Sequence, residues 1–253
     1  MIYQLAKEHG VREKVEAVCG VSFDVELEKE FDIVVSETIG YLGYDENIVE
    51  IMRDARTRFL KKGGLLIPET VSLFAAAGHL KTEMETIPDG LPFNFKILAD
   101  LNLNSPLTSN ENSRLELITE PRRLIESDLY KTNEQPSLEN LRAEWKISNA
   151  EPINCFIVWV ESRLTENINL STRETTAWQP NIYRIKPVEG AFDEVEFNLS
   201  LTRESNYWTV IFTNVRTKNT QSYSPEFAAS ELTLFSRTEN SDLIEKVKMG
   251  INM

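Results

Sequence analysis

The chain has 253 residues, 41% of them hydrophobic and 26% charged, which is typical of a soluble globular protein with one large or two ordinary domains. Its net charge of −13 argues against nucleic acid as a partner. An acidic surface suits cationic partners such as basic peptides, and it is equally expected if the charge only keeps the protein soluble. Two cysteines and two histidines, widely separated, predict neither a disulfide framework nor a metal site, and no apolar run reaches the ~20 residues of a membrane span, so we expect a cytoplasmic protein.

The N-terminal third contains short elements that lead into one strongly apolar strand. Residues 2–10 are predicted to form a short helix that ends at Gly10. Val15–Cys19 is predicted to be a strand, and 21–27 a second short piece. Phe31–Val35 is a nearly unbroken apolar run, which is typical of a strand covered on both faces.

A helical stripe of apolar residues follows this strand. Its members recur at spacings of three and four, and predict a helix over about 47–61: Ile48, Ile51, Met52, Ala55 and Phe59. Gly63 and Gly64 are predicted to end that helix. Leu65–Ile67 is then a strand, and Pro68 marks a boundary.

After Pro68 the period of the apolar residues changes from helical to alternating. Thr70–Ala77 is predicted to be a strand, 79–138 is polar and interrupted by prolines, and 242–249 is predicted to be a terminal helix. Short alternating segments lie between these regions, around 141–147, 155–160, 195–201, 208–212 and 232–234. Several short strands with polar turns predict an antiparallel barrel or sandwich.

Two carboxylates lie on the loop that follows the apolar strand. Glu37 and Glu46 are nine positions apart, beyond the carboxyl end of Phe31–Val35, where open α/β sheets bind their ligands. Guanidinium is planar and always charged, and its fork of N–H donors can be held by two carboxylates. The sequence therefore suggests a guanidinium site, although two solvated loop glutamates would give the same pattern.

The residues around this loop resemble the protein arginine methyltransferase family. The likeness lies in Ser36-Glu37, Gly40-Tyr41 and Glu46, which match its "double-E loop", followed by Ala55-Arg56 and the step from Gly63-Gly64 to Pro68. The resemblance implies the C-terminal part of a class I, Rossmann-like methyltransferase domain at 1–68. An all-β antiparallel barrel at 69–253 would follow, with an arm inserted within 79–138 that reaches a partner subunit in a homodimer.

The resemblance also implies the chemistry and the residues of the site. The reaction would transfer a methyl group from S-adenosylmethionine to a guanidinium nitrogen of an arginine-containing protein. Glu37 and Glu46 would be catalytic, and Tyr41 and Trp178 would bind substrate. Ser22, Phe23 and Ser36 would lie at the cofactor.

Several departures from the family leave other functions open. No G-x-G turn is present, and the likeness begins just past that cofactor motif, so we expect a truncated or half-length protein whose exposed apolar edge favours self-association. The family's T-H-W loop reads Thr176-Ala177-Trp178, and Thr38 replaces its usual aromatic. A methyltransferase acting on a small guanidino or amino metabolite, or a non-catalytic interaction module, therefore remains an alternative.

Overall fold

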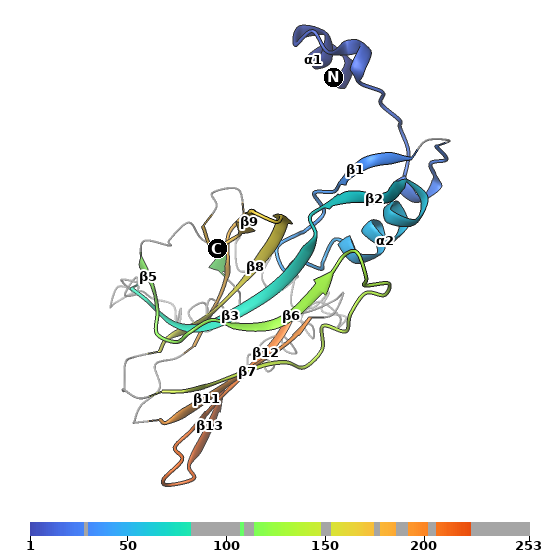
Figure 1. Ribbon diagram of the computed structural model, residues 1–253. Coiled ribbons are helices and arrows are strands. Elements are labelled where there is room, and N and C mark those ends of the chain that lie inside the picture. Colours follow the sequence, from blue (N-terminus) through green and yellow to red (C-terminus); the bar gives the residue numbers. More distant parts are fainter. Residues whose placement is uncertain are drawn as a thin grey trace, which may run out of the picture.

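The computed structural model describes residues 1–27, 30–81, 107–108, 114–147, 153–174, 178–185, 192–201 and 206–223. A small α/β unit lies next to the N-terminal segment, and a larger antiparallel part begins with the long strand β3 (Figure 1). Helix α1 (Ile2–Glu8) stands away from both parts. In the part of the chain that the structure describes, no helix is long and apolar enough to cross a membrane.

The α/β unit consists of two parallel strands and the helix between them. β1 (Phe31–Val35) pairs with β2 (Leu60–Ile67), and α2 (Ile48–Arg58) makes the crossover that parallel pairing requires. Ile48 and Met52 of the predicted apolar stripe are buried, as is Val49, and Ile51, Ala55 and Phe59 are partly buried. The helix predicted from that stripe is therefore confirmed.

The antiparallel part contains two sheets. The first has the order β4-β10-β8-β3-β5, with β6 also on β3 and β9 on β8. Its strands are β3 (Thr70–Leu80), β4 (Leu107–Thr108), β5 (Leu115–Leu117), β6 (Arg122–Asp128), β8 (Cys155–Thr165), β9 (Ile168–Ser171) and β10 (Asn181–Arg184). The second has the order β13-β12-β11-β7, with β7 (Leu141–Lys146), β11 (Glu194–Leu201), β12 (Asn206–Thr213) and β13 (Thr220–Tyr223).

The inward faces of these sheets form the main core. The rings of Phe156 on β8 and Phe197 on β11 are stacked, with centroids 5.0 Å apart, and Tyr183 of β10 packs against Phe197. The same apolar cluster includes Met52 of α2 and Val71 of β3, so it continues across Pro68. The α/β unit followed by an antiparallel β part agrees with the predicted fold class. The division into 1–68 and 69–253 stays a prediction.

The N-terminal segment only partly agrees with its prediction. The helix predicted at 2–10 is confirmed as α1, but the strand predicted at Val15–Cys19 is wrong. The short 3-10 helix η1 (Arg12–Lys14) precedes this stretch, which pairs with no described strand, and the backbone amide of Ala17 bonds the hydroxyl of Tyr3 instead. Strand-like residues form a strand only where a neighbour can complete the ladder. The piece at 21–27 contains the 3-10 helix η2 (Ser22–Asp24).

The prediction that Gly63 and Gly64 end the helix is wrong. Helix α2 ends at Arg58 and β2 begins two residues later, at Leu60, so both glycines lie inside a strand. A Cβ on Gly64 would lie 2.9 Å from the carbonyl oxygen of Asp32 in β1. Glycine at that position permits the close approach of β1 and β2.

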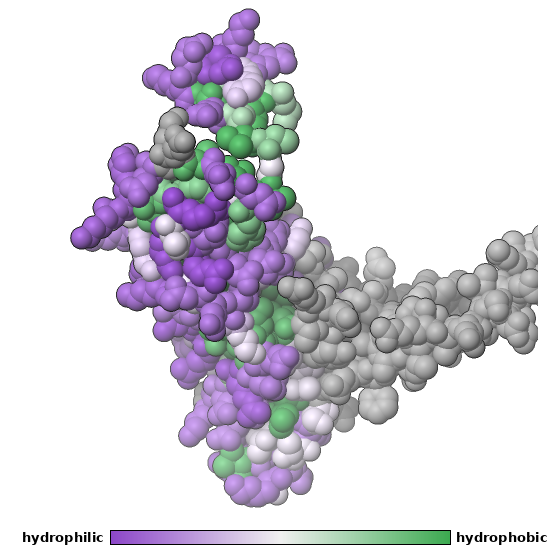
Figure 2. Space-filling model, turned by 90° about the vertical axis from the view of Figure 1, so that its right-hand side faces the viewer, coloured by the Kyte–Doolittle hydropathy of each residue, from purple (hydrophilic) through white to green (hydrophobic). Residues whose placement is uncertain are grey.

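The expectation that β1 is covered on both faces is also wrong. Val34 points toward the core side, whereas Phe31, Ile33 and Val35 share the other face and are exposed. Leu65 of β2, the register partner of Ile33, is exposed beside them. In Figure 2, hydrophobic side chains gather in the upper part of the molecule, where the N-terminal segment joins the body. Helix α2 covers one face of this sheet, and no described element covers the other.

Other predictions are confirmed, corrected or untested. The strands predicted around 70–77, 141–147, 155–160, 195–201 and 208–212 are confirmed as β3, β7, β8, β11 and β12. The strand predicted at Thr70–Ala77 extends to Leu80, so it includes His79, the first residue of the region predicted to be polar and irregular. Strands β4, β5 and β6 fall within the expected arm region, and 82–106 and 109–113 lie outside the described residues. Thr176, Ala177, the segment 232–234 and the helix at 242–249 also lie outside them.

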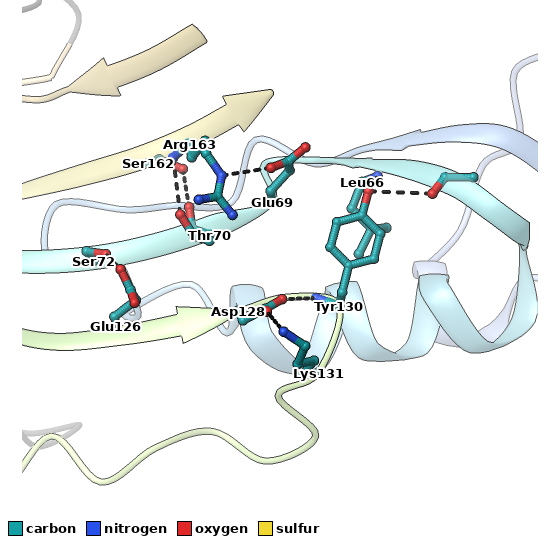
Figure 3. Close-up of polar contacts among 11 residues, drawn as sticks. Leu66, Glu69, Thr70, Ser72, Glu126, Asp128, Tyr130, Lys131, Ser162 and Arg163 are labelled. Carbon is teal, nitrogen blue, oxygen red and sulfur yellow. Dashed lines mark hydrogen bonds and ion pairs between the residues drawn. The ribbon is translucent and has the colours of Figure 1, made fainter. Parts of the chain in front are cut away.

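Polar contacts surround the junction of β2 and β3, where Tyr130 joins the α/β unit to the antiparallel part (Figure 3). The hydroxyl oxygen of Tyr130 accepts a hydrogen bond from the Leu66 amide at 2.8 Å. Glu69 and Arg163 form an ion pair at 2.7 Å, and Ser162 donates to the carbonyl of Thr70 at 2.8 Å. These contacts fix the direction in which the chain enters β3.

Candidate functional site

The loop between β1 and α2 carries the predicted catalytic glutamates, and its two ends are fixed by backbone contacts. At its start, the Ser36 amide donates to the Ile67 carbonyl at 2.9 Å, which extends the β1–β2 ladder by one residue. The Ser36 and Thr38 hydroxyls are 2.9 Å apart and share a hydrogen bond. At its end, Asn47 adopts a left-handed conformation (φ 60°) and α2 begins at the next residue.

Asp45 closes the loop on itself. Its carboxylate accepts hydrogen bonds from the backbone amides of Tyr41, at 3.1 Å, and Leu42, at 2.9 Å. Gly40 lies directly beside this carboxylate with φ +66°, and a Cβ there would be only 2.3 Å from Asp45 Oδ1. Both the backbone conformation and the available space therefore require glycine at this position.

Tyr44 anchors the loop in the antiparallel part. Its side chain is only 2% exposed, and its hydroxyl donates to the carbonyl of Val71 in β3 at 2.9 Å and hydrogen-bonds Ser127 Oγ of β6 at 3.2 Å. Burial raises the pKa of Tyr44 to about 12, because the ionised phenolate would lose its hydration. Gly43 (φ +78°) packs against Val71 and Val160.

Two amide side chains that are distant in sequence hold loop carbonyls. Asn181 of β10 is buried, and its Nδ2 donates to the Tyr41 carbonyl at 3.1 Å. Gln135 donates to the Tyr44 carbonyl at 3.2 Å. The antiparallel part therefore holds the loop from β3, β6 and β10, and sequence reasoning missed all of these anchors. The only local signal was the four-residue spacing of Tyr41 and Asp45, which is compatible with a side-chain-capped turn.

Three carboxylates on this anchored loop are exposed, Glu37, Asp45 and Glu46, and only that of Asp45 is bonded within the loop. Neither glutamate forms a hydrogen bond or ion pair with any described residue. Nearby acidic groups differ, since Asp32 pairs with Lys61 and Asp54 with Arg58. The carboxylates of Glu37 and Glu46 are thus available to a cation. That they face one cavity stays a prediction.

The two predicted substrate-binding aromatics lie on opposite parts of the fold. Tyr41 is in the loop, and its side chain is 57% exposed. Trp178 is half-buried and lies three residues before Asn181, the β10 residue that bonds the loop. This places Trp178 on the segment that leads to the loop. Its packing against Glu37 or Glu46 stays a prediction.

The residues predicted to contact the cofactor lie at opposite ends of β1, with Ser22 and Phe23 exposed in η2. Arg58, which is paired with Asp54, donates to the carbonyls of Ser22, at 2.7 Å, and Val25, at 2.6 Å, and so holds η2 against α2. The Phe23 ring is exposed, and Ser36 lies at the far end of β1. These three residues are thus not brought together as a single S-adenosylmethionine site.

A cleft of about 890 Å³ lies elsewhere, beside the outer face of the second sheet. It is bounded by the residues from β5 to the start of β6 and by strands β7, β11 and β12. Its charged lining is Glu120, Arg122, Glu144, Lys146, Glu194 and Glu196. No predicted site residue lines it, so this cleft and the loop are separate features.

The described ranges contain no group of three or more His, Cys, Asp or Glu side chains that could hold a metal ion. Cys155 is buried in β8, and burial raises the pKa of its thiol to about 12. It is therefore an inert core residue.

Comparison with known proteins identifies the relatives of this chain. No protein-family model matches it. A protein of Oryza sativa subsp. indica named probable protein arginine N-methyltransferase 6.1 is 26% identical over 216 residues, which cover 81% of this chain and 56% of that protein. The chain thus spans about half the length of the curated relatives it matches.

Two solved structures share the fold. The first, titled Trypanosoma brucei PRMT1 enzyme–prozyme heterotetrameric complex with AdoHcy, matches with a TM-score of 0.67 and 13% identity over 88% of this chain and 76% of that one. The second is Arabidopsis thaliana protein arginine methyltransferase 10 in an open conformation, with a TM-score of 0.67 and 15% identity over 87% and 76%. In sequence and in fold, this chain resembles protein arginine N-methyltransferases, and the resemblance predicted from the loop is confirmed.

Proposed function

Starting from this resemblance, we propose that the chain is an arginine N-methyltransferase-like protein whose β1–α2 loop binds a guanidinium group. The observation that carries the proposal is the state of Glu37 and Glu46. Both are exposed and lack a partner among the described residues, on a loop otherwise anchored at Tyr41, Tyr44 and Asp45. Free carboxylates on a fixed backbone suit the binding of a planar cation.

In this proposal the chain's own residues bind and orient the acceptor. Glu37 and Glu46 hold the guanidinium through charge-assisted hydrogen bonds, and Tyr41 and Trp178 shape the surroundings. The two carboxylates draw the positive charge toward the nitrogens they bind, which leaves another nitrogen free to react. Positioning of the reacting nitrogen supplies most of the rate enhancement, because the reaction is an in-line displacement. S-adenosylmethionine, the methyl donor implied by the resemblance, would supply the methyl group when bound.

The test is methyl transfer from labelled S-adenosylmethionine to an arginine peptide, with a matched lysine peptide and free arginine as alternative acceptors. In the proposed complex the bound guanidinium and Glu37 form a buried charge pair. Breaking it in Glu37→Gln should cost at least ~2 kcal/mol and lower the rate roughly thirtyfold or more. Glu166→Gln, in the exposed β8–β9 turn, is the matched control and should leave the rate unchanged. Equal rates in the two variants would refute a role for Glu37.

The same assay separates the alternatives. Transfer to free arginine but not to the peptide would favour a small-molecule methyltransferase. This alternative is motivated by Ala177 and Thr38, which replace two residues that are usual in the family. No binding of S-adenosylmethionine in calorimetry would favour a non-catalytic interaction module. Ser22 and Phe23 are exposed and lie apart from Ser36, and this observation supports testing cofactor binding first.

A homodimer, a cytoplasmic location and an arginine-containing protein substrate belong to the same proposal. The trypanosomal neighbour is titled a heterotetrameric complex, which supports testing assembly by light scattering. A monomer at all concentrations would contradict the dimer, and methylation of small guanidino compounds alone would contradict the protein substrate.

A further inference from the structure

The β1–α2 loop has a third carboxylate, Asp45, which differs from its neighbour Glu46 in having partners. The two oxygens of Asp45 accept hydrogen bonds from two successive backbone amides, Tyr41 at 3.1 Å and Leu42 at 2.9 Å. These bonds occupy the carboxylate within the loop. Asp45 is therefore engaged with the backbone, whereas Glu46 has no partner among the described residues.

The peptide groups on both sides of Tyr41 are held from two directions. The Tyr41 amide donates to Asp45 within the loop, and the Tyr41 carbonyl accepts from Asn181 Nδ2 on β10, at 3.1 Å. Asn181 is itself buried, so its amide group has little freedom. The loop backbone midway between Glu37 and Glu46 is thus fixed by one loop residue and one strand residue 140 positions away.

The fit of Asp45 depends on Gly40. With φ +66° and a virtual Cβ 2.3 Å from Asp45 Oδ1, Gly40 leaves the space that the carboxylate occupies. Asparagine has nearly the same shape as aspartate. An exchange to asparagine therefore changes the hydrogen bonding and keeps the packing.

We propose that Asp45 and Asn181 are positioning residues, which fix the loop so that Glu37, Tyr41 and Glu46 are held ready for a guanidinium. The inference rests on the proposed function. Asp45 is not proposed to touch the substrate, since its carboxylate is directed at the Tyr41 and Leu42 amides of its own loop. It acts through Glu46, the next residue, because fixing one residue's backbone sets the direction of the following one.

Asp45→Asn in the full chain is the first test. Asparagine can accept from one of the two amides but presents its own N–H to the other, so one hydrogen bond is lost. Asp128→Asn is the matched control, because Asp128 also accepts from a backbone amide, that of Tyr130 at 3.0 Å, in a turn outside the loop. Asn181→Ala has its own control in Asn154→Ala, since Asn154 hydrogen-bonds the backbone of Leu80.

Two quantities are measured for each variant. The first is the dissociation constant of an acetylated, amidated Gly-Arg-Gly peptide, with Gly-Lys-Gly as the reference. We expect Asp45→Asn and Asn181→Ala to weaken arginine binding by about fivefold or more, which corresponds to one lost hydrogen bond. The second is hydrogen exchange at the Tyr41 and Leu42 amides, which Asp45→Asn should accelerate by about the same factor. Both controls should leave both quantities unchanged.

The outcomes distinguish the two proposals. Unaltered arginine binding in Asp45→Asn and Asn181→Ala would overturn the positioning role, even if their stability fell. If the unaltered chain binds neither peptide, the proposed function fails. The loop-closing role of Asp45 is then decided by hydrogen exchange alone, and unchanged protection of Tyr41 and Leu42 in Asp45→Asn would overturn that as well.

Discussion

The hydroxyl oxygen of Tyr130, in the turn after β6, lies 2.8 Å from the backbone amide of Leu66 in β2 and accepts its hydrogen bond (Figure 3). Leu66 is buried, and its register partner in β1, Val34, lies along the opposite edge of β2 from Tyr130. One side chain of the antiparallel part therefore completes the hydrogen bonding of the parallel unit. Without it, the outer edge of β2 would have an unpaired amide at this position.

Tyr130→Phe should lower the free energy of unfolding by about 1 kcal/mol, because the Leu66 amide loses its acceptor. The cost is at the low end of the usual range, because Tyr130 is 36% exposed and water can take the place of its hydroxyl. Urea unfolding of the two proteins measures this change in the free energy of unfolding. Tyr41→Phe, whose exposed hydroxyl has no partner among the described residues, is the control, and an equal loss in both variants would contradict the prediction.

Gly40→Ala should be much more destabilising than Gly63→Ala. Both glycines have positive φ, +66° and +80°, so both substitutions carry the backbone strain of roughly 1–2 kcal/mol. A Cβ on Gly63 meets nothing within 4 Å, whereas a Cβ on Gly40 displaces the Asp45 carboxylate. We expect the Gly40 variant to lose about 1–2 kcal/mol more, for the two amide bonds of Asp45. Equal midpoints in urea would show that Asp45 can move without cost.

Alkaline pH should destabilise the chain partly through Tyr44. Its pKa is about 12 in the folded protein and near 10 when unfolded, so the unfolded state releases its proton first and stability falls between pH 10 and 12. Tyr44 accounts for at most about 2–3 kcal/mol of this loss in the free energy of unfolding, because its pKa differs by about two units between the two states. The thiol of Cys155 has a pKa of about 12 in the folded protein and near 9 when unfolded. It therefore adds a further loss of stability that begins at a lower pH, near 9.

Unfolding of Tyr44→Phe across pH 8 to 12 tests this assignment. The variant should lose about 1 kcal/mol at neutral pH, from its bonds to Val71 and Ser127, and should show a shallower decline above pH 10. Cys155→Ala should instead remove the part of the decline that begins near pH 9. The same slope above pH 10 with and without the Tyr44 hydroxyl would contradict the role of Tyr44.

The exposed face of the β1–β2 sheet should promote self-association, because parallel sheets are normally covered on both faces. Ile33→Thr and Leu65→Thr, at residues 50% and 48% exposed, should together lower the mean mass in light scattering. Threonine keeps the strand preference and removes apolar surface. Ile168→Thr, at an exposed position in β9, is the control. A monodisperse monomer before any substitution would contradict this expectation.

Local patterns were enough to predict several elements. The stripe from Ile48 to Phe59 predicts α2 because burial of one helix face follows the helical period. The alternation in β7 and β11 predicts strands with one buried face for the same reason. The positions of Glu37 and Glu46 after an apolar strand also predict their place at its carboxyl end. Each of these inferences depends on residues that are close in sequence.

Tertiary structure alone decided the remainder, because the deciding partners are distant in sequence. Val15–Cys19 has strand-forming residues but no described strand beside it. Phe31–Val35 is apolar except for Asp32, although no described element covers one of its faces. Gly64 continues a strand because Asp32 lies against it. The loop is held by Asn181 and by Tyr44 bonded to β3 and β6, and such pairings depend on which strands become neighbours once the chain has folded.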